Sequence, residues 1–157
     1  MGNAKTPGTG VSELRSHVGF WLRFVSNHVS QAFARKLLHS GVTAAEWVVL
    51  REMYDRPEMS PGLLADLTGM TRGAASKLMD RLFARKLVTR QERADDRRYQ
   101  DIELTPAGRR LVPVLAAIAD RNDEEFFKPL SARERAALVS TLIKLAQAHG
   151  LQKIPAK

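Results

Sequence analysis

Residues 71–105 read TRGAASKLMDRLFARKLVTRQERADDRRYQDIELT, and the spacing of apolar residues changes within this stretch. In its first half they recur every three or four positions, as on one face of an amphipathic helix. The apolar positions of this half are Ala75, Leu78, Met79, Leu82 and Phe83. Residues 87–90 and 99–104 suit strands, and residues 94–98 between them suit a charged tip. The stretch therefore predicts a helix with one core face, followed by a β-hairpin.

The opposite face of this predicted helix is small and basic. It carries Arg72, Gly73, Ser76, Lys77 and Arg81. Residues 71–98 hold nine Lys or Arg and four Asp or Glu, a net charge of +5, whereas the other 129 residues carry a net charge of +3. DNA requires donors for base edges in the major groove and cations that displace counterions from phosphate. We therefore expect this surface to contact double-stranded DNA.

The residues before this helix predict a helix-turn-helix. Thr43 and Glu46 form a capping box for a helix that runs to about residue 55. Ser60 followed by Pro61 is typical of the start of another helix. Gly69 suits the turn after it, and Thr71 suits the cap of the basic helix.

Three further apolar helices are predicted around this unit, over residues 12–39, from residue 105 to about 127, and from residue 131 to about 150. Their apolar faces need a partner, and a second copy of the chain is the economical one. We divide the chain into a disordered arm (1–11), an N-terminal dimerisation helix (12–41), a winged helix-turn-helix lobe (42–104) and C-terminal dimerisation helices (105–157). The predicted fold is mainly α with a small β-hairpin wing, an α+β arrangement.

Composition narrows the function classes. The chain has 157 residues, 44% of them hydrophobic, with a net charge of +8 and a pI near 10.3, which favours an anionic partner. It contains no cysteine, which excludes disulfides and thiolate chemistry. The three histidines of the first helix are about 16 Å apart, too far for one metal ion. We expect no metal site, no cofactor and no membrane span, and a cytoplasmic location.

The order of these elements and the run RQERADDRRYQDIELTPAGRRL (residues 90–111) resemble the MarR family of bacterial transcription regulators. In that family a strand ends in Arg, the wing carries Asp-x-Arg, and a Leu-Thr-x-x-Gly segment opens the next helix. The matching residues are Arg90, Asp96, Arg98, Leu104, Thr105 and Gly108. The segment 63–87 also fits the family's helix-turn-helix, and the resemblance spans about residues 12–150. Gly73 departs from the family, which often has a hydroxyl residue there.

The resemblance implies a homodimeric repressor that binds a palindromic operator, with recognition helices in successive major grooves and wings at the flanking minor grooves. The expected DNA-binding residues are Arg72, Gly73, Ser76, Lys77, Arg81, Arg90, Asp96, Arg97 and Arg98. We expect Arg98 to enter the minor groove, with Asp96 orienting its guanidinium. The resemblance also implies a pocket for a small aromatic or phenolic effector, and its candidate residues are Trp21, Arg23, Phe24 and Trp47.

Other functions stay open on the sequence. A winged helix also serves as a protein-interaction adaptor, and a DNA-binding protein of this kind need not respond to a ligand. A membrane-surface protein would need a continuous apolar face to insert, but here that face has a helix-turn-helix to pack on. An enzyme is not expected, because neither paired catalytic carboxylates nor a phosphate loop nor a nucleophile with its base is evident.

Overall fold

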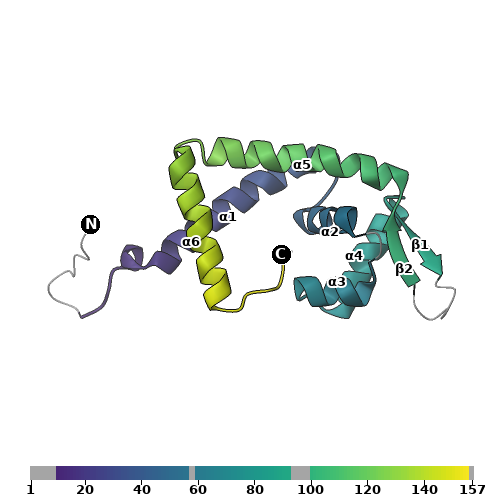
Figure 1. Ribbon diagram of the computed structural model, residues 1–157, viewed down its shortest axis with the longest axis horizontal. Coiled ribbons are helices and arrows are strands. Elements are labelled where there is room, and N and C mark those ends of the chain that lie inside the picture. Colours follow the sequence, from purple (N-terminus) through teal and green to yellow (C-terminus); the bar gives the residue numbers. More distant parts are fainter. Residues whose placement is uncertain (1–9, 57–58, 93–99, 156–157) are drawn as a thin grey trace.

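In the computed structural model the chain is elongated, with a head at one end and two long helices leading away from it (Figure 1). The structure describes residues 10–56, 59–92 and 100–155. The helices are α1 (Val18–Leu37), α2 (Ala44–Asp55), α3 (Pro61–Thr68), α4 (Arg72–Ala84), α5 (Pro106–Phe126) and α6 (Ala132–Ala148), and the strands are β1 (Val88–Glu92) and β2 (Gln100–Leu104). This is the mainly helical fold with a small wing that the sequence predicts.

The helices of the head begin where local hydrogen-bonding signals place them. The Thr43 side chain accepts from the Glu46 backbone N–H, and the Glu46 carboxylate accepts from the Thr43 N–H, so the capping box of α2 is complete. The Thr71 hydroxyl caps α4 by accepting from the Ala74 N–H. Gly69 ends α3 with a φ of 69°, a left-handed conformation that glycine adopts without strain. The predicted helix-turn-helix is confirmed.

The wing is anchored to the head by a residue that no sequence pattern marks. Strands β1 and β2 pair antiparallel, with Val88 opposite Leu104. Met59, fully buried, adds a single β-bridge on the other edge of β2 by exchanging two backbone hydrogen bonds with Ile102. The hairpin is therefore hydrogen-bonded to the loop between α2 and α3 as well as to itself.

A compact junction connects α4, the wing and α5. The Thr105 hydroxyl accepts from the Gly108 N–H at 3.1 Å, capping α5, and donates to the Lys86 carbonyl at 2.7 Å. The Thr105 N–H donates to the Leu87 carbonyl at 3.0 Å. A Cβ at position 108 would overlap that same carbonyl oxygen, so only glycine allows this approach. The structure thus explains why the Leu-Thr-x-x-Gly segment has threonine and glycine at these two positions: threonine caps α5 and glycine leaves room for the Leu87 carbonyl.

One hydrophobic core crosses the boundaries expected at residues 42 and 105. Leu37 from α1 and Leu115 from α5 are fully buried in the same cluster as Leu50, Leu64 and Leu82 of the head. The ends of α1 and α5 that lie near the head are therefore part of its folding unit. Only their distant ends and α6 extend beyond it (Figure 1).

Two expectations need correction. The first predicted helix is not continuous, because the extended backbone of His17 separates a 3-10 turn (Leu14–Ser16) from α1. Phe83, placed on the core face of α4, is 46% exposed. Phe83 lies in the last turn of the helix, and its ring packs against the Arg90 guanidinium, whose Cζ is 4.9 Å from the ring centroid, and not in the core. The predicted wing tip at residues 94–98 and most of the predicted arm lie outside the described residues.

Helix α6 has almost no packing of its own within the chain. Its capping box is complete, and hydrogen bonds from the Ser131 side chain and backbone lower the pKa of the Glu134 carboxyl. No residue of α6 is buried, and Leu138, Leu142 and Ile143 are all exposed. The chain exposes 11710 Å². A compact monomer of this mass exposes about 7,900 Å².

The segment after α6 returns to the head. The Ile154 N–H donates to the Leu67 carbonyl in the last turn of α3 at 2.8 Å. The Lys153 side chain lies against Gly69, so closely that a Cβ there would contact it. We call residues 151–155 the return segment. It ties the far end of α6 to the α3–α4 turn (Figure 1).

The Gly108 contact predicts the effect of a single methyl group. Gly108→Ala should lower the free energy of unfolding by about 1–3 kcal/mol, because the new Cβ must displace the Leu87 backbone. Gly73→Ala is the matched control, since Gly73 also lies in the first turn of a helix and its added Cβ would meet nothing. The control should gain up to about 1 kcal/mol. Chemical denaturation measures both, and equal stability of the two variants would contradict the junction described above.

Candidate nucleic-acid interface

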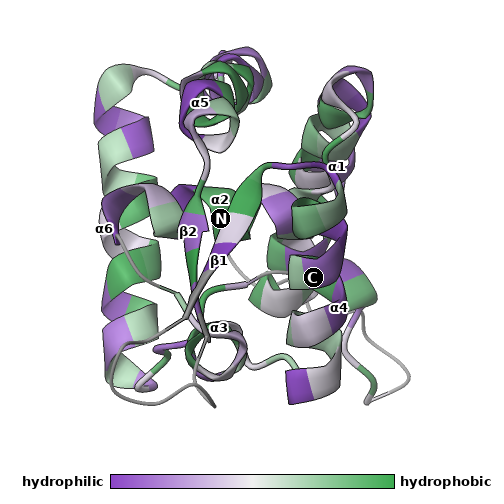
Figure 2. Cartoon of the chain, turned by 90° about the vertical axis from the view of Figure 1, so that its right-hand side faces the viewer, coloured by the Kyte–Doolittle hydropathy of each residue, from purple (hydrophilic) through white to green (hydrophobic). Residues whose placement is uncertain are grey.

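Helix α4 separates a buried face from an exposed basic face. Its apolar side, including Leu78 and Leu82, packs into the core. Arg72, Ser76 and Lys77 on the other side are exposed. Figure 2 shows α4 alongside the wing strands, with hydrophilic and hydrophobic segments alternating along it. The structure thus brings the predicted residues of this helix face together on one surface.

Gly73 leaves this surface open at the start of α4. An added Cβ would meet no atom within 4 Å. Arg72 is the first residue of the helix, directly after the Thr71 cap. A helix that presents its first turn in this way leaves the Arg72 guanidinium free to reach a bidentate acceptor such as the edge of guanine.

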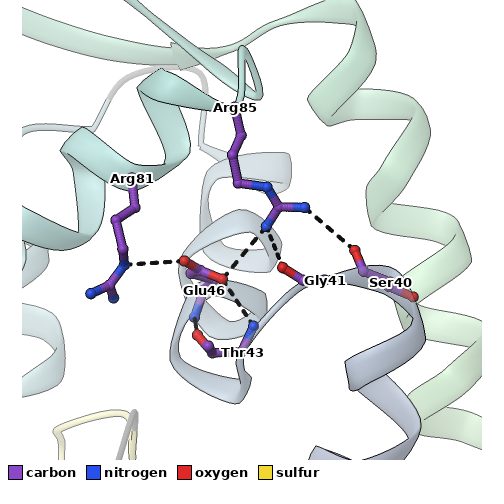
Figure 3. A network of polar contacts seen from close by, with 6 residues as sticks. All are labelled: Ser40, Gly41, Thr43, Glu46, Arg81 and Arg85. Carbon is purple, nitrogen blue, oxygen red and sulfur yellow. Dashed lines mark hydrogen bonds and ion pairs between the residues drawn. The ribbon is translucent and has the colours of Figure 1, made fainter.

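Arg81 and Arg85 are engaged within the chain (Figure 3). The Arg81 Nε donates to Glu46 Oε1 at 3.2 Å. The Arg85 Nη1 donates to the Gly41 carbonyl at 2.6 Å and lies 3.7 Å from Glu46 Oε2. Its Nη2 donates to the Ser40 carbonyl at 3.4 Å. Arg81, which the sequence places on the DNA-facing side, is therefore partly committed to a buried carboxylate.

Arg90 joins β1 to α4. Its Nη2 donates to Asp80 Oδ1 at 2.6 Å, and its guanidinium lies over the Phe83 ring. An exposed pair of this kind stabilises by only about 0–1 kcal/mol, but the added cation–π contact fixes the direction of the side chain. Arg90 thus positions the wing on α4, in addition to the expected contact with DNA. Asp96, Arg97 and Arg98 lie outside the described residues.

The four candidate pocket residues do not come together within one chain. Trp21 and Phe24 lie next to each other on α1, with ring centroids 6.1 Å apart, and both are exposed, as is Arg23. Trp47 of α2 packs instead on Phe33, farther along α1. Trp47 thus belongs to the head, whereas the other three lie on the part of α1 that extends away from it.

Two clefts lie between α1 and α5. The first has a volume of about 200 Å³ and is lined by Val29, Ser30, Phe33, Ala119, Asn122 and Asp123. The second, of about 330 Å³, is lined by Lys36, His39, Ser40, Ile118 and Arg121. In the first cleft Asn122 is 3% exposed, and its Oδ1 meets no hydrogen-bond donor among the described residues. Its Nδ2 donates to the Val29 carbonyl at 3.4 Å.

Other classes of site are not found in the part of the chain that the structure describes. Within residues 10–56, 59–92 and 100–155, His, Asp and Glu side chains do not gather into a group that could hold a metal ion. Over the same ranges, none of the helices has both the length and the apolar character needed to cross a membrane.

Comparisons with known proteins agree with this geometry. A family model described as MarR family matches residues 40–98. The structure of BpsR from Bordetella bronchiseptica superposes with a TM-score of 0.76 and 30% identity, covering 87% of this chain and 98% of BpsR. The chain belongs to the MarR family. It is therefore a DNA-binding transcription regulator with a winged-helix fold, and not an enzyme.

Two further bacterial regulators are similar to this chain over most of their own length. The transcriptional regulator HosA of Escherichia coli O157:H7 is 29% identical over 104 residues, which are 66% of this chain and 77% of HosA. A probable transcriptional regulator from Pseudomonas aeruginosa has 28% identity and a TM-score of 0.75, covering 85% of this chain and 99% of its own. For BpsR, the regulation of DNA binding by 6-hydroxynicotinic acid has been described.

Sequence reasoning missed three residues of this region. Glu46 was predicted only as a helix cap, although its burial and its two arginine partners make it the centre of a network. Met59 and Asn122 carry no motif at all. A carboxylate in an otherwise apolar helix segment was the one available signal, because Glu46 is followed by Trp47, Val48, Val49 and Leu50.

Proposed function

We propose that this regulator is a homodimeric repressor that reads a palindromic operator with the exposed face of α4. The observation that carries the proposal is that Arg72, Ser76 and Lys77 are exposed together while the other face of the helix is buried. Residues in the first turn of a recognition helix contact base edges, whereas cations elsewhere neutralise phosphate. A dimer bound at an operator that overlaps a promoter would block transcription.

Further residues of α4 and the wing would extend this interface. The proposed additional contacts are Gly73, Arg81, Arg90, Asp96, Arg97 and Arg98. A narrow A·T-rich minor groove attracts a guanidinium without reading a unique base pattern, which suits Arg98. Asp96 would orient that guanidinium. This role predicts weaker rather than tighter binding when Asp96 is removed.

The dimer is supported by the unpaired apolar surface. Trp21, Leu22 and Phe24 of α1, and Leu142 and Ile143 of α6, are exposed in the single chain. The excess exposed area of the chain is larger than the roughly 800 Å² that each partner buries in a standard interface. In a two-fold dimer formed by these helices, the two α4 helices would enter major grooves about 34 Å apart.

Removing residues 131–157 tests α6 as part of the dimer interface. Deleting residues 131–157 should abolish the dimer and lower the thermal stability of the chain, because the apolar faces of α1 and α5 lose their partner. Deleting residues 2–9 is the control and should change neither property. Sedimentation equilibrium and circular dichroism measure both, and a well-folded dimer formed by the truncated chain would refute the assignment of this interface.

Arg72 provides the test of sequence reading. The operator is first selected from a random DNA pool with the purified protein. Arg72→Ala should then cost about 1–3 kcal/mol of binding and relax the preference at one base pair of each half-site. Arg51→Ala on α2 removes the same charge from outside the proposed surface and should leave the preference intact. An equal loss of affinity by Arg72→Ala for all sequences would assign Arg72 to phosphate instead.

We also propose that an aromatic or phenolic effector weakens operator binding by occupying the first α1–α5 cleft. Val29, Phe33 and Ala119 offer apolar surface for a ring, and the unsatisfied Asn122 Oδ1 would accept from a hydroxyl or N–H of the ligand. The heteroaromatic acid that regulates BpsR belongs to this chemical class. Such a ligand acts only if it binds more tightly to a dimer whose recognition helices are wrongly spaced.

Trp47 allows this cleft to be observed directly, because it packs on Phe33 with ring centroids 6.4 Å apart. The chain has two tryptophans, so Trp21→Phe leaves Trp47 as the only indole. Phenolic acids should change its fluorescence in a saturable way, and Asn122→Leu should weaken that binding about tenfold, the effect of one hydrogen bond lost from a buried site. Unchanged affinity in Asn122→Leu would exclude this cleft. Gln31→Leu, on the exposed surface of α1, is the control.

A further inference from the structure

Glu46 is buried far more than its role as a helix cap requires. Its side chain is 5% exposed, yet it carries a carboxylate that accepts from the Thr43 N–H at 2.9 Å. The second capping box of the chain makes the comparison, since Glu134 performs the same hydrogen bonding with Ser131 while remaining exposed. A buried carboxylate is costly unless it is paired and hydrogen-bonded. Capping α2 therefore does not explain why the Glu46 carboxylate is buried, and its other partners do.

The partners of Glu46 come from the second half of α4. Arg81 lies in its last turn and Arg85 is its C-cap residue. Arg85 also donates to the carbonyls of Ser40 and Gly41, at the end of the 3-10 turn (Leu38–Ser40) that follows α1 (Figure 3). Arg85 therefore links the end of α4 both to the Glu46 carboxylate at the start of α2 and to the segment between α1 and α2.

The contacts with Glu46 lie at the opposite end of α4 from its base-reading turn. Arg81 lies nine residues after Arg72, about 14 Å along the helix. A tilt of about 15° at the Glu46 end would therefore move the first turn of α4 by about 3.5 Å, close to the 3.4 Å rise of one base pair. A small change in helix direction at the Glu46 end would therefore shift the base-reading end by about one base pair.

We propose that Glu46 is a positioning residue for operator recognition, clamping the end of α4 to the α1–α2 junction through Arg81 and Arg85. The proposal rests on the proposed reading of DNA by α4. Because α1 carries the proposed dimer surface, the clamp connects the spacing of the two half-sites to the dimer. The residue acts on DNA only through α4 and touches no base itself.

The position of α4 can be measured without DNA. The chain has no native cysteine, so Ala74→Cys on α4 and Arg35→Cys on α1 give unique positions for spin labels, and both are exposed. Labelled chains are diluted with unlabelled ones so that only distances within one chain are observed. Glu46→Gln, which keeps an oxygen for the Thr43 N–H but loses the charge, should broaden or shift the α1–α4 distance distribution. Glu134→Gln should leave it unchanged.

The functional readout is discrimination of half-site spacing. Affinity is compared between the selected operator and the same operator with one base pair inserted between its half-sites. In Glu46→Gln the penalty for the insertion should fall by about 2- to 30-fold, the range for residues that modulate coupling between sites. A residue needed only for stability would lower the melting temperature and leave this penalty unchanged.

Arg85→Gln keeps the proposal testable if Glu46→Gln does not fold. It leaves Glu46 paired with Arg81, and its own side chain is 36% exposed. It should change the distance distribution and the spacing penalty in the same direction as Glu46→Gln. A narrow, unshifted distribution together with a wild-type penalty in the folded variants would overturn the clamp. If no operator is selected at all, the proposed DNA reading fails, but the distance measurement still decides the clamp.

Discussion

The Leu87 carbonyl oxygen is the point on which the arrangement of the head depends. It accepts from the Thr105 N–H, and its position leaves no room for a side chain at residue 108. Because α4 ends at Ala84, β1 starts at Val88 and α5 begins at Pro106, this backbone contact lies where the recognition helix, the wing and the long helix meet. The Thr105 hydroxyl reinforces it by joining Lys86 to the first turn of α5.

Local signals in the sequence predict most of this fold. Capping boxes at Thr43 and Ser131, and the left-handed glycine at Gly69, act over a few residues and are recognisable from composition and spacing. The exposure of Phe83 and the bridge made by Met59 depend on segments distant in the chain, so no periodicity reveals them. The same distinction applies to the site. The exposed face of α4 follows from helical spacing, whereas the clefts depend on how α1 crosses α5.

Counting charges in the sequence predicts a basic surface, but it does not distinguish arginines that have partners within the chain from those that are exposed without one of the contacts described above. Arg81, Arg85 and Arg90 are engaged with Glu46, backbone carbonyls, Asp80 and the Phe83 ring. Arg72 and Lys77, in contrast, are exposed on the outer face of α4. Arg81, Arg85 and Arg90 would reach phosphate only by sharing or giving up these internal partners, so the net charge of this region does not by itself set the salt dependence of DNA binding.

The return segment gives the head a second mechanical support. One attachment is the Leu87 junction with α5, and the other is the hydrogen bond from Ile154 to Leu67, beside Gly69. Both lead back to the α5–α6 arm, so the chain closes a ring through the head (Figure 1). The near ends of α1 and α5 share the core of the head, so this side of the ring is rigid. The other side is closed by the Ile154 hydrogen bond, and pulling α6 away from the head breaks that bond first.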